Sequence, residues 1–188
     1  MAENNTNEIG LGKGNVLGYA FVAPMGTALP TDATTKLDTK YVNLGFISED
    51  GITNATDTDT TEVNDMNGTK VLSVVSSYGE TYQFALLQTN EDTLKLRYGN
   101  SRVTKQNGKI TVFHGIPTGD HMRLVFELVM AGDVPKRIVV PDATLSEVDD
   151  MQYHSGDAVM YTMTFNANPS AEIQGNTSVD YIGAAAEE

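Results

Sequence analysis

Two histidines and an aspartate lie close together between His114 and His121. The stretch His114-Gly-Ile-Pro-Thr-Gly-Asp120-His121 could bring two imidazoles and a carboxylate together across a turn. Imidazole and carboxylate groups are common ligands of zinc and other transition metals. Glycine and proline between the histidines are also typical of a surface turn between two strands. We favour the turn over the metal site.

An acidic stretch that begins at Asp57 offers a second kind of metal chemistry. Asp57 and Asp59 alternate as the first two ligands of a calcium-binding loop do, and Glu62 follows. However, Thr61 stands at the third ligand position, and no glycine follows it where such loops turn sharply. The pattern therefore favours a solvated acidic segment over a calcium site.

Other arrangements that could carry chemistry are incomplete. Gly10, Gly12 and Gly14 could suggest a phosphate-binding loop, but no strand precedes them and no Gly-Lys-Ser/Thr ending follows. The paired carboxylates Glu49-Asp50 and Asp149-Asp150 lack visible partners for acid–base catalysis. The motifs Gly-x-Ser-x-Gly and His-Glu-x-x-His are absent. We expect a protein that is not an enzyme, with no catalytic residue, cofactor or metal.

Composition narrows the class of protein. The chain has 188 residues, 40% of them hydrophobic, which is enough for one ordinary domain with a core. It has no cysteine, which excludes disulfides and thiolate metal sites. Its net charge is −13 with only 12 scattered basic residues, which argues against a nucleic-acid-binding surface. No apolar run could span a membrane, and no secretory signal is visible at the N-terminus.

The pattern along the chain predicts a mostly β domain. Aromatic and β-branched residues at strand-like spacing recur between turn residues, and Asn107-Gly108 predicts a tight hairpin. The expected strands are 16–23, 41–48, 70–76, 80–88, 101–106, 109–114, 121–131, 136–140 and 158–167, with a turn near Ser77-Tyr78-Gly79.

One short helix is expected after the strand at 80–88. Thr89 or Asn90 can cap it, acidic residues occupy its first turn, basic residues its last turn, and Gly99 ends it. This distribution of charge is the one that the helix dipole favours. The expected fold is an antiparallel β-sandwich or barrel flanked by this helix.

The remaining segments complete the expected domain organisation. Residues 1–14 are interpreted as a flexible arm, 15–183 as a single domain, and 184–188 as a loose tail. Residues 53–69, rich in Thr, Asp and Asn, are interpreted as a long loop. Loops of that length in a compact domain are commonly functional, so this segment is the first place to look for contacts with other chains.

The order of these elements resembles a known family. Tyr41-Val-Asn-Leu-Gly-Phe-Ile-Ser-Glu-Asp-Gly-Ile52, the acidic segment after it, and Met163-Thr-Phe-Asn-Ala-Asn-Pro169 resemble the major tail tube proteins of long-tailed, siphovirus-type bacteriophages. The preceding arm through Pro24 and Pro30 resembles theirs as well. The resemblance covers about residues 10 to 183, and it depends on the order of elements because no single motif is diagnostic.

The resemblance implies a structural virion protein, made in the host cytoplasm. Six copies would form a ring whose inner sheets join around a lumen, and rings would stack into a tube. The implied partners are further copies of the chain, a tape-measure protein, and tail terminator and tail-tip proteins. Genome DNA would pass through the lumen without specific binding, which an acidic lining would favour because it repels phosphate.

By the same resemblance, the 53–69 segment would contact a neighbouring subunit or ring. Its apolar residues Val63 and Met66 could dock into the neighbour, and its acidic residues could meet scattered bases there. The residues expected to make this contact are Asp57, Asp59, Glu62, Val63, Asp65 and Met66.

Two other functions remain open from the residues. A tube subunit of a contractile tail or of a secretion system would share the same features, but it would need a sheath partner. A carbohydrate-binding or adhesive β-sandwich would present aromatic platforms. The absence of Trp counts against this second reading, although eight Tyr keep it open.

Overall fold

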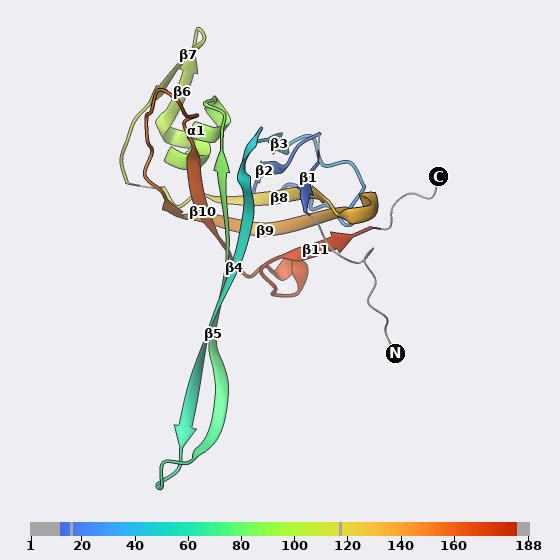
Figure 1. The fold of residues 1–188 in the computed structure, drawn as a ribbon, viewed down its shortest axis with the longest axis vertical. Coiled ribbons are helices and arrows are strands. Elements are labelled where there is room, and N and C mark those ends of the chain that lie inside the picture. Colours follow the sequence, from blue (N-terminus) through green and yellow to red (C-terminus); the bar gives the residue numbers. More distant parts are fainter. Residues whose placement is uncertain (1–11, 16, 117, 184–188) are drawn as a thin grey trace.

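The computed structural model describes residues 12–15, 17–116 and 118–183. Within these residues, nine strands form one antiparallel sheet in the order β3-β2-β8-β9-β10-β5-β4, with β1 also pairing with β8 and β11 with β9. β6 and β7 form a separate hairpin beside the helix (Figure 1). The strands are β1 (Lys13–Gly14), β2 (Ala20–Pro24), β3 (Val42–Asn43), β4 (Ile47–Asn64), β5 (Lys70–Leu86), β6 (Val103–Gln106), β7 (Lys109–Val112), β8 (His121–Val129), β9 (Pro135–Val148), β10 (Tyr161–Ala167) and β11 (Val179–Ile182).

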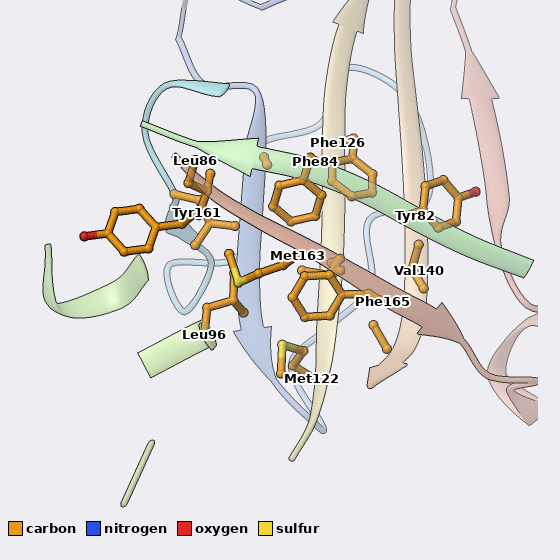
Figure 2. Packing of buried hydrophobic residues seen from close by; sticks show 14 of the residues in the cluster. Tyr82, Phe84, Leu86, Leu96, Met122, Phe126, Val140, Tyr161, Met163 and Phe165 are labelled. Carbon is orange, nitrogen blue, oxygen red and sulfur yellow. The ribbon is translucent and has the colours of Figure 1, made fainter. Parts of the chain in front are cut away.

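The main core lies between the two ends of this sheet. β10, β5 and β4 cross over β8 and β9, so that residues from both groups of strands face one another (Figure 1). Phe84 of β5 packs edge-on against Phe126 of β8 at 5.4 Å between ring centroids, and it stacks on Phe165 of β10 at 5.5 Å. Figure 2 shows this aromatic group surrounded by Met163, Leu86 and Val140. The expected mostly β fold with one flanking helix is confirmed.

A second apolar cluster covers the opposite face of β8 and β9. Val125 and Val139 are fully buried there, beneath Tyr41 and other residues of the segment 25–41. Arg137 donates to the main-chain oxygens of Asp32 and Thr35, at 2.7 and 2.8 Å, and so fastens the segment to the sheet. The arm expected through Pro24 and Pro30 therefore lies packed against the domain.

The predicted helix is confirmed with its caps. α1 runs over Glu91–Tyr98, and the Asn90 side chain accepts a hydrogen bond of 2.8 Å from the Thr93 amide. Gly99, at a φ of 96°, ends the helix, and its amide donates to the Lys95 carbonyl. Leu94 and Leu96 are buried against the end of the main core. Three short 3-10 turns complete the described helical elements: η2 (Asn100–Arg102), η3 (Ala131–Asp133) and η4 (Ala171–Ile173).

Some predicted strands differ in extent. The 41–48 segment is interrupted after β3, where Gly45 adopts a φ of 85°, and pairing resumes in β4 at Ile47. β9 does not end at Pro141 but continues to Val148. The register with β8 shifts between Met122 and Leu124, and Pro141 lies in that irregularity. Proline is tolerated at a bulge because no ladder hydrogen bond from its nitrogen is required.

The prediction of a long loop at 53–69 is wrong, as is the turn at 77–79. β4 and β5 form a continuous hairpin that projects far from the body of the domain (Figure 1). Thr residues recur along β4, and β-branched side chains favour the extended backbone even where charged neighbours suggest a loop. Only residues 65–69 turn. There the Asp65 side chain accepts hydrogen bonds from the amides of Asn67 and Thr69, both at 2.8 Å.

The predicted arm and tail lie largely outside the described residues. Residues 1–11 and 184–188 are not described. Lys13 and Gly14, the last two residues of the predicted arm at 1–14, pair with Val129 and Leu128 of β8, so this part of the arm belongs to the sheet. Val16, the first residue of the strand predicted at 16–23, is also outside the description, and the strand itself begins at Ala20.

Candidate assembly interface

The outer part of the β4–β5 hairpin, residues 56–80, stands away from the rest of the described chain and forms the outer hairpin. β10 pairs with β5 from Tyr161–Leu86 to Asn166–Thr81. Between Lys70 and Glu80, β5 pairs with β4 alone among the described residues. The opposite edge of β5 therefore presents unpaired main-chain groups, which makes it a template for another strand.

Apolar side chains occupy both faces of this outer hairpin. Directly opposed residues of an antiparallel pair share a face. Val63 opposes Leu72 and Thr61 opposes Val74, which places an exposed apolar group on one face. Thr58 opposes Tyr78 and Thr60 opposes Val75, which places a second group on the other face. The exposed apolar side chains of the outer hairpin are Val63, Met66, Val71, Leu72, Val74, Val75 and Tyr78.

Exposure of this kind is unusual for a free ribbon. Val75 is 60% exposed and Val71 61%, although β-branched apolar residues are normally inside. A two-stranded ribbon is at best marginally stable alone in water, and a contiguous apolar surface commonly marks an interaction site. The outer hairpin is therefore the strongest candidate for a contact with another chain.

Three of the four acidic residues expected at this contact have partners within the hairpin. Glu62 forms an ion pair with Lys70 across the hairpin, and Asp65 is used in the turn at its tip. Asp59 accepts a hydrogen bond of 3.0 Å from Ser77. These three acidic residues therefore help to hold the hairpin together.

The sequence-based expectation omitted the apolar residues of β5. Val71, Leu72, Val74 and Val75 were assigned to a strand but not to the contact. The sequence did contain a signal for this contact. Val71-Leu72 and Val74-Val75 are consecutive apolar residues, whereas a strand with one face in solvent alternates apolar and polar residues. Tyr78 was placed in a turn, and it lies instead on the continuous strand.

A buried carboxylate marks the base of the outer hairpin. Glu80 is 7% exposed and accepts hydrogen bonds from Asn54 at 2.8 Å, from Tyr82 at 2.9 Å and from Ser178 at 3.1 Å. Thr177 donates to its second oxygen. Burial alone would raise the pKa of Glu80, but these hydrogen bonds outweigh burial and hold the pKa below its ordinary value of 4.5. Burial raises the pKa of Tyr82, so its hydroxyl remains a donor.

The residues considered for metal chemistry do not converge. Among the described residues, no group of three or more His, Cys, Asp or Glu side chains could hold a metal ion. His114 packs on the Tyr98 ring at 4.6 Å between centroids, whereas His121 contacts Asp142 at 2.6 Å. Asp57 and Asp59 lie within β4 and not in a loop.

No helix in the described part of the chain is long and apolar enough to cross a membrane.

Comparison with solved structures finds similar chains at low sequence identity. The cap of the anti-feeding prophage, a tube-terminating cap, is 10% identical with a TM-score of 0.45, over 88% of this chain and 89% of that chain. The sheath–tube complex of an extracellular contractile injection system, PVC, in the extended state is 11% identical with a TM-score of 0.39, over 89% and 90%. The anti-feeding prophage baseplate is 12% identical with a TM-score of 0.41, over 82% and 92%.

A protein-family model matches most of the chain. No curated protein matches the sequence. The family model described as phage tail tube protein matches residues 1–180, which include all of the β4–β5 hairpin and all but the last two residues of the sheet from which it projects. The chain belongs to the phage tail tube protein family.

Proposed function

We propose that this chain is the structural, non-enzymatic tube subunit of a siphovirus-type tail. Six copies close into a ring, and rings stack into a hollow tube within the virion after synthesis in the host cytoplasm. Rotation of one chain closes a ring, and repeated translation of that ring extends a filament. Membership of the phage tail tube family supports this assignment.

The observation that carries the proposal is the outer hairpin. It exposes apolar side chains on both faces and a free strand edge on β5. Burial of these groups against neighbouring copies would stabilise the ribbon, at about 25 cal/mol per Å² of apolar area removed from water. The contact includes the expected residues Asp57, Asp59, Glu62, Val63, Asp65 and Met66, extended by the apolar residues of β5, namely Val71, Leu72, Val74, Val75 and Tyr78.

The face of β10 and β5 away from the main core is suited to line the lumen. Thr162, Thr164 and Asn166 alternate on β10 with the buried residues of that strand, so they lie on the opposite face of the sheet. Gln83 of β5 joins them and donates to Thr164 at 3.2 Å. Neither β4 nor β10 contains Lys or Arg. A lumen lined by these uncharged polar side chains would let DNA pass without holding its phosphates.

A tube of defined length needs further partners that set its length and close its ends. A tape-measure protein would occupy the lumen before DNA does. Terminator and tail-tip proteins would close the two ends of the stack. The terminator and tail-tip proteins would meet the same surfaces that join ring to ring.

Removal of the outer hairpin tests the proposal. Asp57 pairs with Gly79, so residues 58–78 can be replaced by Asn-Gly, which forms a two-residue hairpin turn. We expect negative-stain electron microscopy to show tubes for the concentrated wild-type protein and single particles for the shortened variant. Near-ultraviolet circular dichroism of the variant serves as the control for an intact core.

Two results would contradict the proposal. Tubes formed by the shortened variant would show that the outer hairpin is not the assembly contact. Wild-type protein that stays as single particles even when a tail-tip complex is added would overturn the tube assignment itself.

A further inference from the structure

The outer hairpin can act as a contact only if its direction is defined. Eleven residues of β5, Lys70 to Glu80, project beyond its last pair with β10. This is a length of about 36 Å at the rise of a β-strand. A tilt of about 10° at the base would move the tip by about 6 Å, which exceeds the spacing of about 4.8 Å between paired strands. Some group at the base must therefore resist tilting.

Glu80 lies at the position where that resistance is needed. It is the first residue of β5 beyond the last pair with β10, formed by Thr81 and Asn166. The residue is 7% exposed, and its carboxylate receives hydrogen bonds from three separate segments. Asn54 donates from β4, Tyr82 from β5, and Thr177 and Ser178 from the segment before β11.

The segment that contributes Thr177 and Ser178 is itself held firmly. β11 begins at the next residue, where Val179 pairs with Val139 in the centre of β9. On the other side, the Ser170 amide donates to the Asn176 carbonyl at 2.9 Å and closes the loop around η4. The two hydroxyl groups therefore connect the hairpin base to β9, through β11, and to the loop around η4.

We infer that Glu80 is the positioning residue that sets the direction of the hairpin, by joining its base to the Thr177–Ser178 segment, and so determines where the hairpin reaches a second copy of this chain. The inference rests on the proposed function of the hairpin as an assembly contact. The hydroxyl and amide donors require an acceptor with several lone pairs, and an ionised carboxylate supplies about four. A neutral amide at the same place would offer one acceptor oxygen and two competing donors.

A distance measurement between spin labels tests the inference directly. The chain has no cysteine, so two introduced cysteines would be the only labelling sites. Asn67→Cys lies in the turn at the hairpin tip and Glu147→Cys lies on the exposed end of β9. Pulsed electron–electron double resonance on labelled protein, diluted with excess unlabelled protein, reports the distance within one chain whether or not tubes form.

Three substitutions in this labelled background separate positioning from general stability. Glu80→Gln removes the charged acceptor, and Thr177→Val removes one donor without changing the hairpin. Ser77→Ala is the matched control, because it removes a hydrogen bond of 3.0 Å to Asp59 on the exposed part of the same hairpin. Melting temperature is recorded for each variant.

We expect a narrow distance distribution for wild type and for Ser77→Ala. We expect a shift or broadening of more than about 5 Å, one strand spacing, for Glu80→Gln and Thr177→Val. Wild-type distances in both variants would overturn the inference, as would a broad distribution in the wild type. Thr177→Val keeps the test decisive if Glu80→Gln does not fold.

Sedimentation of tubes from the same variants separates this inference from the proposed function. Altered distances with loss of tubes support both. Altered distances with normal tubes support the role of Glu80 and contradict the hairpin contact. Unaltered distances with loss of tubes contradict the role of Glu80 and leave the contact in place.

Discussion

Arg137 forms an ion pair with Glu127 across β9 and β8, at 2.5 Å between Nη2 and Oε1, on the face of the sheet opposite the main core. Both side chains are largely buried, at 4% and 15% exposed. The same guanidinium holds the main chain of Asp32 and Thr35. One side chain thus neutralises a buried carboxylate and fastens the segment 25–41 to the sheet.

Replacement of this arginine is expected to be strongly destabilising. Arg137→Met would leave Glu127 buried without its partner, and removal of one partner from a buried pair costs about 3–5 kcal/mol. Urea denaturation followed by circular dichroism measures the loss. Lys136→Ala is the control, because its ion pair with Asp180 is more exposed and is expected to cost less than about 1 kcal/mol. Equal effects of the two substitutions would contradict the role of burial.

A charge on the outer hairpin is expected to block assembly without unfolding the protein. Val74 is 51% exposed, so Val74→Glu should change the free energy of unfolding by no more than about 0.5 kcal/mol. In a tube the same side chain would be buried and unpaired, and tubes should be lost in electron microscopy. Thr104→Glu places the same charge on exposed β6 as a control. Normal tubes from Val74→Glu would exclude this residue from the contact.

The ionised side chain of Glu80 is expected to make the stability of the folded protein depend on pH. Its pKa in the folded protein lies below the ordinary value of 4.5, because four side chains donate hydrogen bonds to its ionised form. Its stabilising contribution is therefore fully present above about pH 4.5 and is lost as the pH falls through the folded pKa. The melting temperatures of wild type and Glu80→Gln should differ most above pH 5 and converge in acid. A difference that grows toward low pH would contradict this assignment.

The N-cap of α1 gives a prediction on local stability. Asn90 accepts a hydrogen bond from the Thr93 amide, and loss of such a cap costs about 1 kcal/mol. We expect Asn90→Ala to lower the free energy of unfolding by this amount in urea denaturation. Asn90→Asp should restore it, since aspartate is an equally good cap and its charge favours the helix N-terminus. Failure of aspartate to restore stability would point to another role for Asn90.

Elements with local signals could be predicted from the sequence. Asn90 and Gly99 define the ends of α1, and Asn107-Gly108 defines the turn of the β6–β7 hairpin. Each of these signals lies directly beside the element that it defines. In β10, Met163 and Phe165 alternate with polar residues, and both are fully buried. Caps and tight turns depend on neighbouring residues, so these features were readable without a partner strand.

The longest element could not be predicted, because its signals conflict. Thr and Asp in 53–64 suit a solvated loop as well as an exposed strand, and pairing with β5 decides between them. β9 continues past Pro141 because the register with β8 shifts at that point, which depends on a distant strand. Five of the eleven residues proposed for the contact were missed as well, since Val71 and Val74 are exposed only because β5 continues past its last pair with β10.

The sequence by itself determined the acidic charge, the absence of cysteine, the short capped helix and a mostly β chain. Only the tertiary structure decided that residues 47–86 form one projecting hairpin, that its apolar side chains lie on both faces, and that Glu80 joins its base to Thr177 and Ser178. The physical reason is that strand pairing and burial depend on partners far away in the chain. Glu80 and Thr177 are 97 residues apart, and no local pattern brings them together.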